Sequence, residues 1–124
     1  METINKLSIY TNNNQDFYLL LGDFLDTFYL ADKHTQDTMI AEPPMEMPQP
    51  ELVPFLAATV HKLAIDYNIE VPPWVFEPRC YLPGDTPHFA FNAKGKIRFL
   101  LMYKSPSEFK HRNLFVDENV LVRV

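Results

Sequence analysis

Seven basic residues crowd into the segment 94–112, with three aromatic residues between them. The bases are Lys94, Lys96, Arg98, Lys104, Lys110, His111 and Arg112, and the rings are Phe99, Tyr103 and Phe109. Cationic side chains contact phosphates and exposed rings stack on bases, so this pattern is typical of nucleic-acid binding. The whole chain, however, has a net charge of -5, whereas nucleic-acid-binding domains are usually strongly basic. Because the same rings also suit a hydrophobic core, nucleic-acid binding is the alternative and not the leading hypothesis.

Three aspartates form an acidic group in the N-terminal half. Asp16, Asp23 and Asp26 lie near one face of a helix that the apolar spacing predicts. Paired carboxylates do acid-base work when burial separates their pKa values. These three lie opposite a strong apolar stripe, so we expect a solvated acidic face instead. Such a face also complements a basic surface on a partner.

Arg112 differs from the other bases because Asn113 follows it directly, at the end of a predicted helix. A guanidinium at a helix end binds the last carbonyl oxygens or a neighbouring carboxylate, here that of Asp117 or Glu118. We therefore expect Arg112 to be a structural anchor. Capture of a carboxylate or phosphate from a ligand is the alternative interpretation.

The residues that enzymes and metal sites need are scattered. The histidines are His34, His61, His88 and His111. They do not fall in a metal-ligand spacing. Cys80 is the only cysteine, which excludes an internal disulfide, and no pattern supplies it with a base. The three glycines are not clustered, which argues against a phosphate-cradling loop. We predict no cofactor, no metal site and no catalytic residue, so an enzyme is the less favoured class.

Charge is divided unevenly along the chain. Residues 1–78 hold three Lys and Arg against twelve Asp and Glu, a net charge of -9. Residues 79–124 hold eight bases against four acids, a net charge of +4. The plain interpretation is an acidic and a basic face that partly neutralise each other within one domain. The alternative is a basic surface for an acidic partner or a nucleic acid.

Two amphipathic helices are predicted in the N-terminal half. Apolar residues recur at every third or fourth position over about 14–32, which predicts the first helix. The same period returns over about 51–67, where Pro54 falls in the first turn. Residues 1–11 are expected to be a mobile lead-in with a short strand at Leu7–Tyr10.

The segment between these helices is rich in proline. Four prolines lie within the eight residues 43–50, with Met45 and Met47 between them. Proline lacks an N–H and fixes φ, so residues 33–50 are predicted to form an extended Pro-rich linker. This linker either joins the two helices or exposes a Met/Pro segment to a partner.

Residues 71–124 are predicted to form a C-terminal module of short helices. A pair of prolines predicts a turn in which Trp74 plugs the core. Residues 94–104 fit a helix, which we favour. They also fit the second strand of a β-hairpin over 89–101, which would make the fold α+β.

The end of the chain carries clearer helix signals. Residues 105–108, Ser-Pro-Ser-Glu, match a capping box and predict a helix over 106–112 with Phe109 facing inward. Asn113 is expected to end that helix. Asp117 is then placed to cap a last turn that runs through Val120 and Leu121.

The order of these C-terminal motifs resembles a module of uncharacterised bacterial proteins. The matching residues are Pro73-Trp74, Ile97–Met102, Ser105-Pro106, Phe109, Arg112-Asn113-Leu114-Phe115-Val116 and Asp117–Leu121. The resemblance covers under half of the chain and implies a helical module. Some of its members resemble partners in toxin–antitoxin or nucleotidyltransferase loci, so it implies an antitoxin-like role and assigns no catalytic residue.

We therefore expect one small, mainly α-helical domain over residues 1–124. The favoured function is a non-enzymatic protein-interaction module of the bacterial cytoplasm. A signal peptide is not apparent, and the longest apolar runs fall far short of the roughly 20 residues of a membrane span. A protein partner is expected at the acidic first helix or the Met/Pro segment, and nucleic-acid binding through residues 94–112 is the alternative. The candidate partner-binding residues are Asp16, Asp23, Asp26, Lys94, Lys96, Arg98, Lys110 and Arg112.

Overall fold

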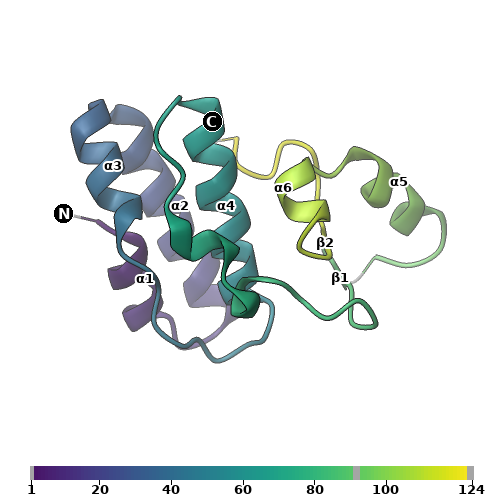
Figure 1. Ribbon diagram of the computed structural model, residues 1–124. Coiled ribbons are helices and arrows are strands. Elements are labelled where there is room, and N and C mark those ends of the chain that lie inside the picture. Colours follow the sequence, from purple (N-terminus) through teal and green to yellow (C-terminus); the bar gives the residue numbers. More distant parts are fainter. Residues whose placement is uncertain (1, 91–92, 123–124) are drawn as a thin grey trace.

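The computed structural model describes residues 2–90 and 93–122, which are mainly α-helical, as predicted. The helices are α1 (Ile4–Tyr10), α2 (Asn14–Leu30), α3 (Lys33–Ala41), α4 (Leu52–Asp66), α5 (Lys96–Lys104) and α6 (Ser107–Lys110). The other elements are the 3-10 turns η1 (Pro73–Phe76) and η2 (Pro78–Cys80) and the strands β1 (His88–Phe89) and β2 (Leu114–Phe115). Helices α1 to α4 form a bundle, and α5 projects on the other side of the molecule (Figure 1).

Helix α4 is the centre of the core. Eleven of its 15 residues are buried, because the helix is enclosed by others and is apolar on most sides. The ring of Phe55 meets Phe17 of α2 at 5.5 Å and Phe109 of α6 at 5.2 Å, both edge to face. These contacts join the bundle to the C-terminal module in one core. Both long helices are confirmed, with ends that differ from the predictions by one or two residues.

The N-terminal segment is a helix, so the prediction of a mobile lead-in with a short strand was wrong. The side chain of Thr3 caps α1 by accepting a hydrogen bond from the N–H of Lys6. Ile4 and Leu7 are buried, and α1 packs against α2 and α3. Burial of these two side chains holds a helix that is too short to be stable alone.

The Pro-rich linker is shorter than predicted, because its first half is the helix α3. The carboxylate of Asp32 caps this helix by accepting a hydrogen bond from the N–H of Thr35 at 2.8 Å. Gln36, Met39 and Ile40 form the buried face of α3, with the spacing i, i+3, i+4. The prolines that follow keep only the second half of the segment out of helix.

Trp74 plugs the core, as predicted. The side chain is buried in η1, and its indole Nε1 donates a hydrogen bond to the carbonyl oxygen of Ile40 at 3.0 Å. This bond ties the turn after α4 to the end of α3. It also satisfies the polar end of a large ring that is otherwise surrounded by apolar side chains.

The hairpin alternative was wrong, since residues 96–104 form α5. The only sheet among the described residues is a parallel pair, in which His88 aligns with Leu114 and Phe89 with Phe115. A parallel pair needs a long crossover, and the chain supplies it with α5 and α6. Helix α5 packs on β2.

Ser105 does not form the predicted capping box. Its Oγ accepts a hydrogen bond from the N–H of Val116 at 2.7 Å and lies 2.6 Å from the carbonyl oxygen of Leu101, to which it donates. The N-cap position of α6 is occupied by Pro106, whose side chain cannot accept a capping hydrogen bond. Helix α6 is consequently shorter than the predicted 106–112.

Phe109 is fully buried, as predicted. The prediction that Asn113 ends the helix was wrong, because α6 ends at Lys110 and Asn113 lies in the turn that follows, with a φ of 65°. The carboxylate of Asp117 accepts a hydrogen bond from the N–H of Asn119 at 2.8 Å and starts the last turn. Among the described residues, every helix is too short or too polar to cross a membrane.

Candidate interaction surface

Helix α5 exposes most of its large apolar side chains to solvent. Their exposed fractions are 57% for Ile97, 72% for Phe99, 53% for Leu100, 43% for Met102 and 81% for Tyr103. These five residues are called the α5 surface below. Leu101 is the only buried residue of this nine-residue helix. The helix therefore leaves in water the kind of side chains that the rest of the fold buries.

The α5 surface was not predicted from the sequence, although the sequence contains a signal for it. Residues 99–103 are five consecutive apolar residues, and consecutive residues point to different sides of a helix. One packing face cannot bury all of them. The aromatic residues within 94–112 were instead interpreted as core residues. This is true of Phe109 and wrong for Phe99 and Tyr103.

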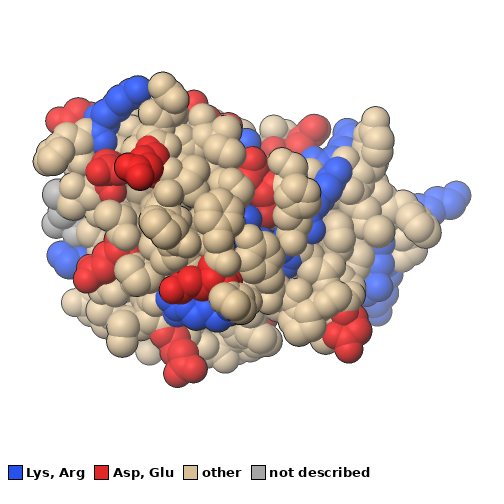
Figure 2. Space-filling model, in the orientation of Figure 1, with Lys and Arg blue, Asp and Glu red and all other residues tan. Residues whose placement is uncertain are grey.

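Four predicted basic residues lie on or next to α5. Lys94, Lys96 and Arg98 surround its first turn and are exposed. Lys110 lies on α6 and donates from Nζ to the carbonyl oxygen of Tyr103 at 2.8 Å. Lysine and arginine side chains accordingly gather at the right-hand end of the space-filling view, where α5 lies (Figure 2).

Arg112 does not belong to this basic surface, and its place among the partner-binding residues was wrong. Its side chain is only 1% exposed. Nη2 donates to the carbonyl oxygen of Val75 at 2.8 Å, and Nη1 donates to that of Glu108 at 3.0 Å. The guanidinium also lies 4.8 Å from the ring centre of Tyr81. Arg112 is the expected structural anchor, but it binds carbonyls and not the predicted carboxylates of Asp117 or Glu118.

The buried guanidinium also sets the charge of a neighbouring imidazole. Nη1 of Arg112 lies 3.2 Å from Nδ1 of His61. Burial, followed by the positive charge of Arg112, lowers the pKa of His61. Burial likewise lowers the pKa of Arg112. A neutral His61 accepts the hydrogen bond from Arg112, so the pair is a structural contact.

The predicted acidic residues lie elsewhere. Asp16 is half-buried in the first turn of α2, where its N–H donates to the side chain of Asn13 at 2.8 Å. Asp23 and Asp26 are exposed further along the same helix. Helix α2 belongs to the bundle, whereas α5 lies at the opposite end of the molecule (Figure 1). The structure therefore separates the acidic residues from the basic ones instead of bringing them into one site.

The remaining titratable residues show no catalytic arrangement. Cys80 is buried, its Sγ donates to the carbonyl oxygen of Trp74 at 3.3 Å, and burial raises the pKa of its thiol. A raised pKa disfavours the thiolate that a nucleophile requires. In the described part of the chain, no three His, Cys, Asp or Glu side chains are grouped as metal ligands.

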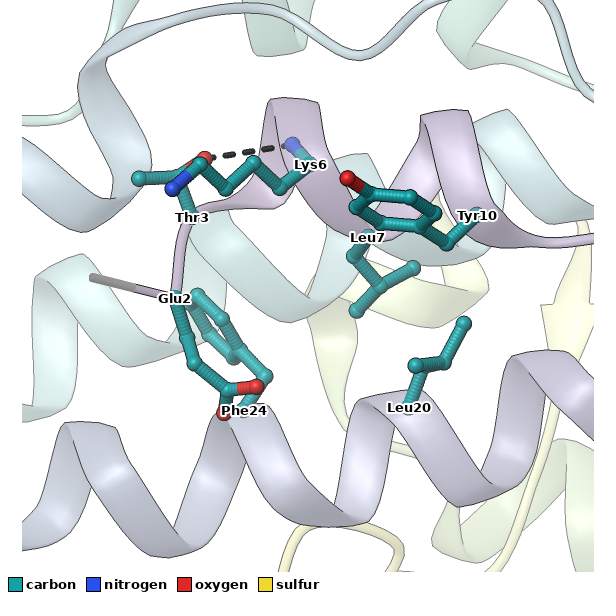
Figure 3. Close-up of a pocket in the computed structure, with 7 residues that line it drawn as sticks. All are labelled: Glu2, Thr3, Lys6, Leu7, Tyr10, Leu20 and Phe24. Atoms are coloured by element: carbon teal, nitrogen blue, oxygen red, sulfur yellow. Dashed lines mark hydrogen bonds between the residues drawn. The ribbon is translucent and has the colours of Figure 1, made fainter.

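Two apolar hollows lie at the seams of the fold. One of about 190 Å³ lies between α1 and α2, where Leu7, Leu20 and Phe24 point toward one another (Figure 3). Another of about 590 Å³ lies between the bundle and the C-terminal module, and its lining residues are Tyr18, Phe55, Ala90, Val116, Asp117, Asn119 and Val120. Both linings are mainly apolar, unlike catalytic clefts with convergent titratable groups.

A third hollow is polar and lies beside the base of α5. It measures about 500 Å³ and is lined by Pro87, His88, Phe89, Lys94 and Arg98. The sequence identified the two bases as a basic cluster, whereas His88 was weighed only as a metal ligand and Phe89 only as part of a hairpin. In the structure both residues form β1, which pairs with β2 beside the base of α5.

Comparisons with known proteins add no family to these observations. No family model, no curated protein and no solved structure matches the chain. The resemblance of residues 71–124 to a bacterial module stays a prediction. Function is therefore inferred from the α5 surface, its basic neighbours and the polar hollow beside them.

Proposed function

We propose that this chain is a non-enzymatic protein-interaction module and that a partner protein docks on the α5 surface. The observation that supports this proposal is the exposure of five large apolar side chains on one nine-residue helix. Large apolar side chains left exposed together on one element mark interaction sites in folded proteins. A partner that covers these side chains removes apolar area from water, and this removal favours association.

The basic neighbours of the α5 surface indicate the charge of the partner. Lys94, Lys96 and Arg98 are exposed at the start of the helix, and a complementary potential steers association and fixes orientation. We infer a partner segment with apolar side chains flanked by Asp or Glu. This composition suits a surface with an apolar centre and a charged rim.

The two surfaces favoured by the sequence analysis are less suited to docking. The Met/Pro segment is tied to α1, because Asn5 Nδ2 donates to the carbonyl oxygen of Pro43 at 2.9 Å and the N–H of Met45 donates to Ser8 Oγ at 2.8 Å. The acidic helix α2 exposes three large apolar side chains over 17 residues, whereas α5 exposes five over nine. We therefore place the main contact on α5.

The family resemblance extends the proposal to a biological setting. Residues 71–124, which include α5, resemble a module of bacterial proteins from toxin–antitoxin-type loci. On this basis we propose an antitoxin-like role in the bacterial cytoplasm, with a partner encoded near the gene of this chain. The exposure of the α5 surface supports the interaction, and the resemblance alone supports the antitoxin-like role.

Co-purification with the products of adjacent genes tests the proposal. We expect one product to form a complex that persists in size-exclusion chromatography, and the double variant Phe99→Ser/Tyr103→Ser to lose it. Leu30→Ser is the matched control, because Leu30 is 90% exposed at the end of α2, away from α5. A chain that stays monomeric with every product overturns the proposal, as does a double variant that binds like the wild type.

Nucleic-acid binding through residues 94–112 is the second candidate. Phe99 and Tyr103 are exposed near Lys96, which keeps rings and a cation available for stacking and phosphate contacts. Against it, Arg112 and Phe109 are buried, so the predicted set of contacts is incomplete. A salt titration with mixed DNA and RNA oligonucleotides tests this candidate function. If the chain binds nucleic acid, binding is present at low salt and weakens as the salt concentration rises.

A further inference from the structure

The polar hollow beside the base of α5 has a positively charged lining. Of its lining residues, Lys94 and Arg98 are cationic, His88 adds an imidazole, and Pro87 and Phe89 are uncharged. The lining residues that the structure describes include no Asp or Glu. The hollow is therefore electrostatically suited to a negatively charged group.

The guanidinium of Arg98 is held in place by two neighbours. It lies over the ring of Phe89, 4.5 Å from the ring centre, and its Nε donates to the carbonyl oxygen of Ala93 at 2.7 Å. Phe89 is itself stacked on Phe115 of the neighbouring strand, at 5.0 Å and with 24° between the planes. A positioned guanidinium loses less side-chain entropy on binding than a freely moving one.

The charges of the hollow are also available to a ligand. Arg98 uses Nε for its hydrogen bond to the backbone, and the described structure records no ion pair for Arg98 or Lys94. By contrast, nearby Lys104 lies 3.7 Å from a carboxylate oxygen of Glu118. The hollow thus holds two cations, Lys94 and Arg98, without an ion-pair partner among the described residues. The guanidinium of Arg98 is fixed in position, and its terminal nitrogens can form a bidentate pair with a carboxylate.

We propose that this hollow binds a carboxylate of the acidic partner segment that docks on α5. The inference rests on the proposed function and specifies where the charge of the partner is recognised. An Asp or Glu side chain of the partner enters the hollow and pairs with Arg98, while Lys94 adds a second positive charge. The apolar side chains of the same segment then lie along the α5 surface.

A carboxylate from a protein suits the hollow better than the phosphate of a nucleic acid. Single-stranded nucleic acids are held by aromatic rings on which their bases stack. Among the described lining residues, Phe89 and His88 carry aromatic rings, and the ring of Phe89 already stacks with Phe115 and lies under Arg98. It is therefore not free to stack on a base. A carboxylate needs no ring to stack on and pairs with Arg98 through its two oxygens.

Titration of the full chain with an acetylated hexaglutamate peptide at low ionic strength tests the proposal. We expect binding in calorimetry and NMR shifts centred on Phe89, Lys94 and the Nε–H of Arg98. Hexaglutamine controls for the peptide backbone, and single-stranded oligothymidylate tests the competing phosphate ligand. Neither is expected to produce these shifts at a comparable concentration.

Three variants localise the effect. Arg98→Gln is expected to weaken hexaglutamate binding by about ten-fold, as for loss of a charge-assisted pair. Lys94→Gln is expected to weaken it less, and it leaves the fold unchanged because Lys94 is exposed. Lys33→Gln is the matched control, since Lys33 is an exposed lysine at the start of α3 in the bundle.

The outcomes separate this inference from the proposed function. Equal weakening by Lys33→Gln and Lys94→Gln overturns the inference, because the attraction is then diffuse. Shifts produced by oligothymidylate and not by hexaglutamate overturn it in favour of nucleic acid. The variant Phe99→Ser/Tyr103→Ser is expected to retain hexaglutamate binding while losing the partner. If the hollow binds hexaglutamate but no partner docks on α5, the proposed function fails alone.

Discussion

Arg112 and His61 are 51 residues apart in sequence, yet Nη1 of Arg112 lies 3.2 Å from Nδ1 of His61. This contact joins the segment that follows α6 to the central helix α4. The guanidinium also reaches the carbonyl oxygen of Val75 in η1. One buried side chain therefore connects α4, η1 and the segment after α6, and its first role is to hold the module against the bundle.

Replacement of Arg112 by methionine is expected to destabilise the fold. Methionine fills much of the same space, but the carbonyl oxygens of Val75 and Glu108 lose their donor. Buried acceptors without partners cost about 1–3 kcal/mol each, so we expect the free energy of unfolding to fall by roughly 3 kcal/mol. Urea denaturation followed by circular dichroism measures the change. Lys33→Met, at an exposed position, is the control, and a similar loss in both variants contradicts the anchoring role.

The stability of the chain is expected to fall as pH drops below about 6.5. Burial and the charge of Arg112 lower the pKa of His61 in the folded state. The unfolded chain, in which His61 has its ordinary pKa near 6.5, therefore binds more protons in this range. The unfolded state then gains stability as pH falls, until the lower pKa of the folded state is reached.

Thermal melts between about pH 7.5 and 5.5 measure this effect, above the range in which most carboxylates titrate. The variant His61→Gln is expected to show a flatter profile than the wild type, because glutamine still accepts a hydrogen bond but does not titrate. His34→Gln is the control, since His34 is exposed on α3. Parallel profiles for the wild type and His61→Gln would show that His61 does not contribute.

The long helices were predictable because their pattern repeats. Helix α2 carries a periodic apolar stripe over four turns, and its burial follows that stripe at Phe17, Phe24 and Phe28. Helices α1 and α3 were missed because each is short and buries only three residues. Their stability comes from packing on neighbouring helices, and a short stretch of sequence holds little information about packing.

The candidate site was predictable only in part, and for a related reason. Lys94, Lys96 and Arg98 were identified because charged residues close in sequence stay close on one helix. The burial of Arg112 depends on its contact with Val75, 37 residues away in sequence. The position of Phe89 under Arg98 goes together with the stacking of Phe89 on Phe115 of the other strand, which no local pattern indicates. Ser105 shows the same limit: its hydroxyl binds Val116, eleven residues away, instead of the local cap that its motif predicts.

Replacement of Trp74 by phenylalanine is expected to weaken the core without unfolding it. Phenylalanine retains most of the buried ring, but the carbonyl oxygen of Ile40 loses its hydrogen bond from Nε1. We expect a loss of roughly 1–2 kcal/mol in the free energy of unfolding, measured by urea denaturation with circular dichroism. Tyr10→Phe removes a polar group from an exposed ring and is expected to be nearly neutral. If Trp74→Phe is equally neutral, the Trp74–Ile40 bond is not stabilising.

Replacement of Gly95 by alanine is expected to disturb the attachment of α5. Gly95 precedes this helix with a φ of 60° and a ψ of -134°, a conformation that residues with a Cβ adopt only with strain. The space around a Cβ at this position is open, so the cost is conformational and not steric contact. We expect a loss of about 1–3 kcal/mol, together with faster amide hydrogen exchange in residues 96–104.

Gly84→Ala is the matched control for this prediction. A Cβ at position 84 also meets open space, and Gly84 is not among the described glycines with positive φ. Alanine there is expected to leave stability unchanged or to raise it slightly, because it reduces the freedom of the unfolded chain. Faster exchange in α5 for Gly95→Ala alone shows that the turn at Gly95 fixes the position of α5. Equal exchange in both variants shows that α5 keeps its position without this turn.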